Sequence, residues 1–327
     1  MRMRLHTFPA FLTLMMTAAL AAIPASASDD GHFDRTLTVS GPLDLEVQTG
    51  SGNITVRAGN SGKVEIHGKI HANGWHIGQD INARIHELET NPPIEQNGNT
   101  IRLGHIEDNE KLRDISISYE LVVPAETKLH SSSGSGDESI DGISGPADSS
   151  SGSGNLRLTN IGGEVRARTG SGGIELNSIR GNTRASTGSG TIHATGIAGG
   201  FNGSSGSGDI RSEQTAVGDV EVSTGSGSVE IKGVKGAVHV RTGSGNISAQ
   251  GEPAGGWKMR TGSGDVTVEL PQQAAFDVLA QTSSGSIESN HEMAVQGTIT
   301  PHELHGKVRG GGVLLDLSTS SGSIKIR

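Results

Sequence analysis

Residues 152–172 read "GSGNLRLTNIGGEVRARTGSG", and this stretch decides the fold. On each side of its central Gly-Gly pair, apolar or small residues alternate with polar residues. A period of two is typical of β-strands with one face buried and the other in solvent. The inward set comprises Leu156, Leu158, Ile161, Val165, Ala167, Thr169 and Ser171, and the outward set comprises Asn155, Arg157, Glu164, Arg166 and Arg168.

The glycine-serine tetrapeptide that ends this stretch recurs along the chain, first at 49–52 and then with a nearly fixed spacing. From the second copy on, the spacing between central serines is about 18 residues, and the last step is slightly longer. Such a period predicts a solenoid, in which each repeat forms one coil stacked on the next. Glycine permits the sharp corners that a coil needs. The central serines are Ser135, Ser153, Ser171, Ser189, Ser207, Ser226, Ser244, Ser263 and Ser284.

The alternation also predicts what fills the interior. If the alternation of the strand is continued through the corner, both the threonine and the central serine of each tetrapeptide fall at inward-facing positions. Because buried hydroxyl groups need partners, we expect stacked Thr and Ser ladders bonded to neighbouring coils or to the corner backbone. The aromatic residues Phe201, Trp257 and Phe276 have inward parity too and are expected in the core, whereas the same pattern does not place Phe33, Trp75 and Tyr119 there.

We therefore predict an all-β fold, a parallel β-solenoid with about 18 residues per coil. Parallel crossovers are right-handed as a general rule. The left-handed hexapeptide solenoid has a coil of the same length, but its inward residues recur at every sixth position, which does not fit the inward positions here. A right-handed coil is expected.

Residues 57–130 break the period and predict a different unit. Strand-like stretches occupy 63–70, 99–104 and 114–124, and residues 78–90 place Ile81, Ile85 and Leu88 at helical spacing. Because the open end of a solenoid exposes unpaired strand edges, this unit is expected to cap it. We assign residues 28–130 to N-terminal strands and a β-rich cap with one short helix, and 131–327 to the Gly-Ser solenoid.

The first 27 residues have the pattern of a secretory signal peptide. Arg2 and Arg4 precede an apolar run, which ends in the small residues Ala25, Ser26 and Ala27. No later stretch is apolar enough to span a bilayer. We expect an exported protein of the periplasm, the cell surface or the extracellular space, with no transmembrane segment after cleavage.

Composition excludes some classes of function. The formal net charge of −9 argues against a nucleic-acid partner, because the phosphate backbone attracts Lys and Arg clusters. The absence of cysteine excludes disulfide bonds and lipidation at cysteine. Glycine, at 50 of 327 residues, is about twice its usual share, which the corners of the solenoid explain.

The motifs predict no catalytic, cofactor-binding or metal-ligating residues. The Gly-Ser-Gly units lack the third glycine of a dinucleotide fingerprint and the Gly-x-Ser-x-Gly pattern of a serine nucleophile. His67 and His71 would share one strand face about 13 Å apart, too far for one metal, and His76 could join them only through a bend. His302 and His305 have no paired ligands nearby. A calcium-binding solenoid needs regular carboxylates after the corner. That column instead reads Asn155, Gly173, Thr191, Asp209, Ser228, Asn246 and Asp265.

Several longer stretches taken together carry a family resemblance. They are "LEVQTGSGNITV" (45–56), "IEQNGNTIRL" (94–103), "LVVPAETKL" (121–129), "VELPQQAAFDVLAQTSSGSI" (268–287) and "GGGVLLDLSTSSGSIKI" (310–326). With the Gly-Ser coils, they resemble the bacterial family called domain of unknown function 4097, also labelled "putative adhesin". The resemblance implies an exported β-solenoid and supplies no catalytic residues.

We accordingly expect a non-enzymatic, adhesin-like surface or cell-envelope scaffold that binds an envelope or extracellular protein or polysaccharide. The alternative is an envelope polysaccharide-acting enzyme on a β-helix scaffold. A monomer is expected, with Lys325 and Arg327 protecting the edge of a last strand that ends the stack.

Overall fold

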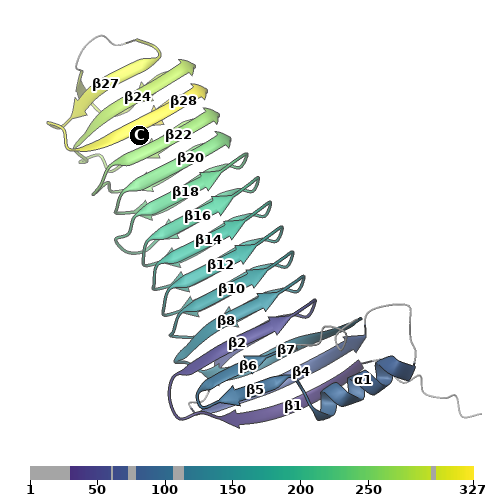
Figure 1. Ribbon diagram of the computed structural model, residues 1–327. Helices are drawn as coiled ribbons and strands as arrows, with labels where there is room; N and C mark the ends of the chain where they lie inside the picture. Colours follow the sequence, from purple (N-terminus) through teal and green to yellow (C-terminus); the bar gives the residue numbers. More distant parts are fainter. Residues whose placement is uncertain (1–29, 60–61, 73–78, 106–113, 296–299) are drawn as a thin grey trace, which may run out of the picture.

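The computed structural model describes residues 30–59, 62–72, 79–105, 114–295 and 300–327. The predicted signal peptide, 1–27, lies outside them. Two long sheets face each other along a rod, and the helix α1 (Gln79–Thr90) lies beside its N-terminal end (Figure 1). Within the described ranges, no helix has the length and apolar character needed to cross a membrane.

The first sheet has 14 strands and is parallel except at its N-terminal edge. In spatial order it comprises β1 (Asp30–Thr38), β4 (Lys63–Ala72), β7 (Ile115–Pro124), β3 (Ile54–Gly59), β9 (Glu138–Asp141), β11 (Leu156–Ile161), β13 (Ile174–Ile179), β15 (Ile192–Ile197), β17 (Ile210–Gln214), β19 (Val229–Val234), β21 (Ile247–Gly251), β23 (Val266–Glu269), β29 (Ile324–Ile326) and β25 (Ile287–Ser289).

The second sheet has 15 strands and is antiparallel only at its two ends. In spatial order it comprises β26 (Met293–Val295), β27 (Glu303–Val308), β24 (Phe276–Ser284), β28 (Val313–Ser321), β22 (Trp257–Ser263), β20 (Val238–Ser244), β18 (Val220–Thr224), β16 (Phe201–Ser205), β14 (Thr183–Thr187), β12 (Val165–Thr169), β10 (Ala147–Ser151), β8 (Thr127–Ser133), β2 (Leu43–Thr49), β6 (Thr100–Leu103) and β5 (Ile94–Asn97).

Each coil contributes one strand to each sheet. The chain passes from β12 through a corner at 170–173 into β13, and through a turn at 180–182 into β14. Parallel pairing joins Val165 to Thr183 and Leu156 to Ile174, so that each residue lies beside its equivalent in the next repeat. The predicted parallel β-solenoid and its period are therefore confirmed.

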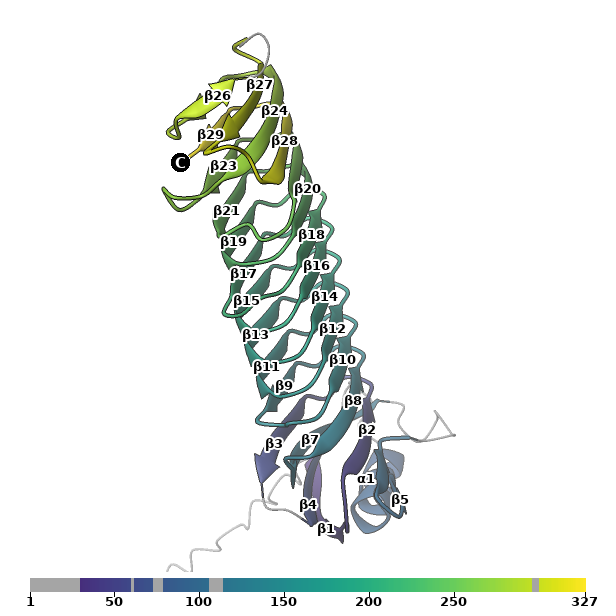
Figure 2. The same cartoon turned by 90° about the vertical axis from the view of Figure 1, so that its left-hand side faces the viewer.

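The hand of the coil can be followed in the pictures. Figure 1 shows the 15-stranded sheet in front, with its strands running from left to right while the chain climbs from β8 to β22. In Figure 2, turned by 90°, the 14-stranded sheet lies to the left of the 15-stranded sheet, which places it behind that sheet in the view of Figure 1. A coil that climbs in this way is right-handed, as the rule for parallel crossovers predicts.

Stacked columns of apolar side chains from both sheets fill the interior. Phe201, Trp257 and Phe276 lie there as predicted, at most 2% exposed. Phe33 and Tyr119, which the repeat pattern does not place in the core, are buried as well, with their ring centroids 6.3 Å apart. They belong to the antiparallel strands of the N-terminal end, whose core lies outside the repeat. Trp75 lies outside the described residues.

The threonines before each corner form the predicted ladder of buried hydroxyl groups. Thr169 Oγ1 donates to the carbonyl of Gly154 in the preceding coil, at 2.8 Å, and accepts from the amide of Gly172 in its own corner, at 3.2 Å. Thr187 repeats both bonds one coil later. Each hydroxyl thus ties two coils together and pairs backbone groups that the corner would leave unsatisfied.

The prediction that the central serines point inward is wrong. Thr224 is buried and Gly227 is buried, but Gly225 and Ser226 between them both face solvent. Two consecutive residues are exposed because the chain turns at the corner. The inward-outward alternation of an extended strand therefore does not continue through the corner. All nine central serines are exposed.

The ladder makes a test of burial possible within one corner. Thr224→Val should lower the free energy of unfolding by about 1–2 kcal/mol, because the Gly208 carbonyl and the Gly227 amide would lose their partner. Ser226→Ala should change it by at most about 0.5 kcal/mol, since the serine is exposed. Denaturant unfolding of both variants measures the difference; equal effects would contradict the assignment.

At the N-terminal end, the first Gly-Ser unit belongs to the stack. β2 and β3, on either side of 49–52, pair in parallel with β8 and β9. Beyond them, β4 pairs antiparallel with both β7 and β1. The helix α1 lies along β1, where the Glu89 carboxylate accepts from the His32 amide at 3.1 Å and Arg35 donates to the Glu89 carbonyl at 3.0 Å. The helix thereby covers part of the strand edge.

The C-terminal end of the rod is interleaved. β28 lies between β22 and β24, and β29 lies between β23 and β25. The outermost coil consists of β24 and β25, and it packs on the coil formed by β28 and β29, which comes later in the sequence. The strand pair β26 and β27 continues the sheet beyond β24 (Figure 2). The prediction that Lys325 and Arg327 protect an open edge is wrong, because β29 has a strand on both sides.

Candidate functional site

The outer face of the 15-stranded sheet carries two columns of polar side chains. We name the column that precedes the buried threonines the serine-arginine column. Each of its members pairs in register with the next strand, and none is a carboxylate. From the N-terminal end its residues are Gln48, Ser132, Ser150, Arg168, Ser186, Ser204, Ser223, Arg241, Arg260, Ser318 and Gln281.

The second column lies two residues earlier on each strand, and we name it the mixed column. Over β12 to β22, it presents cationic, amide, carboxylate and imidazole groups in register. Their side chains point outward because the strand alternates and the residues on either side are buried. The residues are Arg166, Arg184, Asn202, Glu221, His239 and Lys258.

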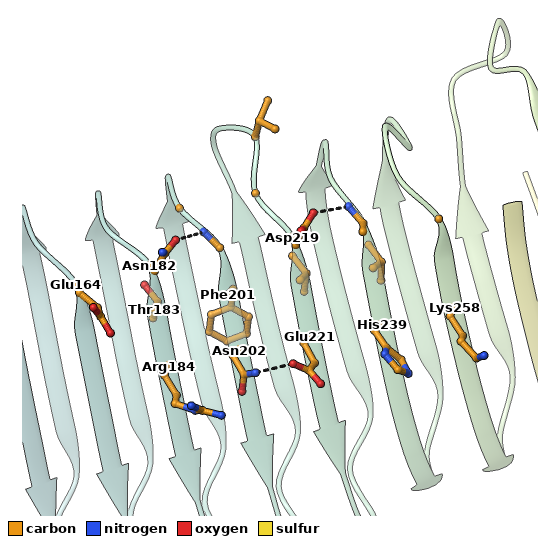
Figure 3. A pocket seen from close by; sticks show the side chains of 18 of the residues that line it. Glu164, Asn182, Thr183, Arg184, Phe201, Asn202, Asp219, Glu221, His239 and Lys258 are labelled. Atoms are coloured by element: carbon orange, nitrogen blue, oxygen red, sulfur yellow. Dashed lines mark hydrogen bonds between the residues drawn. The ribbon is translucent and has the colours of Figure 1, made fainter. Parts of the chain in front are cut away.

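A shallow groove of about 860 Å³ lies over the mixed column, where strands β12 to β22 begin (Figure 3). Arg184, Asn202 and His239 are among the side chains that line it. Val217, in the longer turn between β17 and β18, is 72% exposed and lines it as well. Apart from this valine, the exposed side chains that line the groove are polar, so the groove suits a hydrogen-bonding ligand rather than an apolar one.

Hydrogen bonds fix the rim of this groove. Asn182 Oδ1 accepts from the Gly200 amide at 3.0 Å, and Asp219 Oδ1 accepts from the Ala237 amide at 2.8 Å (Figure 3). Asx side chains thus cap the turns before β16 and β20 and hold the starts of these strands in register.

The carboxylates of the groove are already engaged. Asn202 donates to Glu221 at 2.8 Å, and Glu164 forms an ion pair with Arg166 at 3.0 Å. Asp219 holds the turn described above. In the described part of the chain, these carboxylates thus pair with a backbone amide, a side-chain amide and a guanidinium group.

The sequence profile described as Toastrack DUF4097 matches residues 163–327, which is just over half of the chain. The chain belongs to the Toastrack family. The resemblance seen in the sequence is confirmed, and the matched residues include β12 to β22 and the interleaved end. No curated protein matches the chain.

Three solved structures resemble this Toastrack chain over most of its length. A putative adhesin from Bacteroides fragilis is 12% identical, covers 90% of this chain and 97% of its own, and has a TM-score of 0.34. A putative cell adhesion protein from Clostridium sporogenes is 14% identical, with 90% and 99% coverage and a TM-score of 0.19. A putative lipid binding protein from Parabacteroides distasonis is 12% identical, with 91% and 97% coverage and a TM-score of 0.40. Likeness at this level carries no information on what the Toastrack chain binds.

The histidines weighed as metal ligands lie apart in the Toastrack structure. His67 Nδ1 contacts Asp34 at 2.5 Å, and His71 Nδ1 contacts Asp30 at 3.0 Å, in two separate cross-strand pairs. His305 pairs with Glu303, and His76 lies outside the described residues. Among the residues whose placement is described, no three His, Asp or Glu side chains are grouped as a metal site requires.

The column weighed for calcium has a structural role instead. Asn155 Oδ1 accepts from the Gly173 amide at 2.9 Å, and Asp209 Oδ1 accepts from the Ser228 amide at 2.8 Å. Asp265 does the same for Ser323, at 2.8 Å. These side chains cap the corner of the next coil.

One buried ionisable residue is missed by the motif search. Glu138 is 1% exposed and occupies the inward column between Ile54 and Leu156. Its Oε2 accepts from the hydroxyl groups of Ser131 and Ser149, whereas Oε1 has no partner. Burial raises the pKa of this carboxyl, although both serines oppose the shift. The sequence contains a signal for this residue, because a carboxyl group stands at the inward position where every later coil has an apolar residue.

The raised pKa predicts a dependence of stability on pH. The folded protein holds this proton more tightly than the unfolded chain, so the free energy of unfolding should fall as the pH rises from the ordinary pKa of Glu through the raised value. Glu138→Gln should remove this part of the dependence and stabilise the protein at pH 8 but not at pH 4. Glu175→Gln, on the outer face, is the control. A Glu138→Gln variant with the parental pH profile would contradict the prediction.

Proposed function

We propose that this Toastrack protein is exported and binds a cell-envelope partner along the outer face of the 15-stranded sheet, without catalysing a reaction. The observation that carries the proposal is the pair of polar columns, in register over six successive strands from β12 to β22 and bordering a shallow groove. Such a face spans roughly 24 Å at the usual strand spacing. Its length and regularity suit an extended partner.

Two further observations support this proposal. The carboxylates around the groove are engaged with Ala237, Asn202 and Arg166, which favours a scaffold over an acid-base catalyst. The signal-peptide pattern of residues 1–27 favours export to the periplasm or the cell surface.

Binding is tested by sedimenting the purified protein with isolated cell envelopes. Ser204→Trp places a bulky side chain on the proposed face and should reduce the bound fraction. Ser248→Trp, at a half-exposed position on β21 in the opposite sheet, is the matched control and should bind like the parent. Failure of the parent to sediment, or an equal loss in both variants, would refute the proposed face.

The groove also favours one alternative, a polysaccharide-acting enzyme, because Glu164, Asp219 and Glu221 all line it. Glycoside hydrolysis uses a pair of carboxyl groups. If this alternative holds, the purified protein releases reducing sugar from envelope polysaccharide, and Glu221→Gln abolishes the release. We expect no release from either protein.

A further inference from the structure

We propose that the partner of this face is an anionic polysaccharide, which lies along the rod and binds through the arginines of the serine-arginine column. The inference rests on the proposed binding function and adds the chemical class of the ligand. It is carried by the distribution of charge between the two sheets.

The outer face of β12 to β22 has a surplus of cations. The outward positions of these six strands hold one carboxylate, Glu221, and six cationic side chains. The whole chain, by contrast, has a net charge of −9. The six cations are Arg166, Arg168, Arg184, Arg241, Lys258 and Arg260.

The same six coils are balanced on the other side of the rod. The outward positions of β11 to β21 hold Arg157, Arg211 and Lys232 against Glu175, Glu213 and Glu230. Ion pairs join Arg157 to Glu175 at 2.7 Å and Lys232 to Glu230 at 2.7 Å. The cationic surplus is therefore a property of one face and not of the coil.

Neighbouring carboxylates offset only part of this surplus. Arg166 pairs with Glu164 at 3.0 Å, Arg168 pairs with Asp148 at 3.4 Å, and a single carboxylate, Asp316, serves both Lys258 and Arg260. Exposed pairs of this kind contribute at most about 1 kcal/mol, so an incoming anion can replace them. Within the described part of the chain, Arg184 and Arg241 have no carboxylate partner.

The groups between the cations determine which polymer fits. Ser186, Ser204 and Ser223 separate Arg168 from Arg241 in the column, and Asn202 lies beside them. Hydroxyl and amide groups match the hydroxyl groups of sugars, and guanidinium groups match carboxylate or sulfate. No Phe, Tyr or Trp side chain is exposed on these strands to stack on nucleic-acid bases. Among the described residues, the large apolar side chains exposed on or beside these strands are Val217 and, on the neighbouring strand β28, Leu314, which is little for a membrane-binding surface.

The test measures binding of polygalacturonate, dextran sulfate and uncharged dextran to the purified protein by calorimetry. We expect the two charged polymers to bind at about 0.02 M NaCl and to be released at about 0.5 M, with no binding of dextran. Replacing Arg168, Arg241 and Arg260 together by serine, the residue most common in their column, should weaken binding of both polymers by about tenfold or more.

The control has the same change in net charge on the balanced face, with Arg157, Arg211 and Lys232 replaced by serine. It should bind like the parent. Equal weakening of both triple variants, no weakening of the first, or binding only to phosphatidylglycerol vesicles or duplex DNA would overturn the inference. If the parent sediments with envelopes but binds neither charged polymer, the inference fails while the proposed binding function stands.

Discussion

Gly172→Ala is expected to lower the free energy of unfolding by about 3 kcal/mol or more. A Cβ atom at this position would lie 2.0 Å from the carbonyl oxygen of Gly154 in the preceding coil. Both groups are backbone, so neither can rotate away, and the coils would have to separate where Thr169 ties them together. Steric overlap in a packed interior that cannot relax is among the most destabilising kinds of substitution.

The neighbouring glycine provides the control. A Cβ at Gly173 would meet no atom closer than 3.5 Å, which is an ordinary contact, and the backbone there is not in the left-handed region. Gly173→Ala should therefore change stability by less than about 1 kcal/mol, towards a more stable protein, because alanine restricts the unfolded chain. Denaturant unfolding of the two variants checks both values, and equal midpoints would contradict the stacking of the corners.

Removal of residues 313–327 should detach the whole C-terminal end of the rod rather than a single strand. Among the pairings of the described strands, β24 is joined to the stack through β28 alone and β25 through β29 alone. The truncation also removes the fully buried Leu315, Leu317 and Ile324 from the interior. Hydrogen exchange should show the amides of β24 to β27 losing protection, whereas those of β12 to β18 keep it.

Replacement of Lys325 and Arg327 by serine is the matched control for the truncation. β29 is an inner strand, so this surface change should leave the protection of β24 intact and the oligomeric state the same as that of the parent. Continued protection of β24 after the truncation would contradict the interleaved order. If light scattering shows that the variant with Lys325 and Arg327 replaced forms rods, the hypothesis that these two residues protect an open strand edge would be supported after all.

The repeat pattern predicts most of the architecture for a physical reason. A parallel stack places each residue on its equivalent one period later, so columns such as Leu156, Ile174 and Ile192 follow from the spacing alone. The orientation of Ser226 could not be derived in this way, because the corner changes parity. The interleaved end could not be derived either, because β24 and β28 offer the same inward residue types to a neighbour.

The candidate site could not be predicted from the sequence, because its residues come together only in the aligned strands. Arg168 and Arg241 lie far apart in the sequence, and they join one column only when the strands from β12 to β20 are aligned. The net charge of −9 gives no sign of this cationic surplus, because it is a sum over the whole chain, whereas the surplus is confined to the outward positions of six strands. Glu138 could have been found by reading the inward column for a misplaced carboxyl.

The bond from each threonine hydroxyl to the glycine carbonyl of the coil before it has an evolutionary consequence. Thr187 bonds to Gly172 in the way that Ser205 bonds to Gly190, so every junction between coils presents the same partners. A duplication or loss of one whole repeat, such as 173–190, would leave each remaining junction matched. The rod can therefore change in length by single repeats during descent, whereas a gain or loss of a single residue in a corner would misalign a junction.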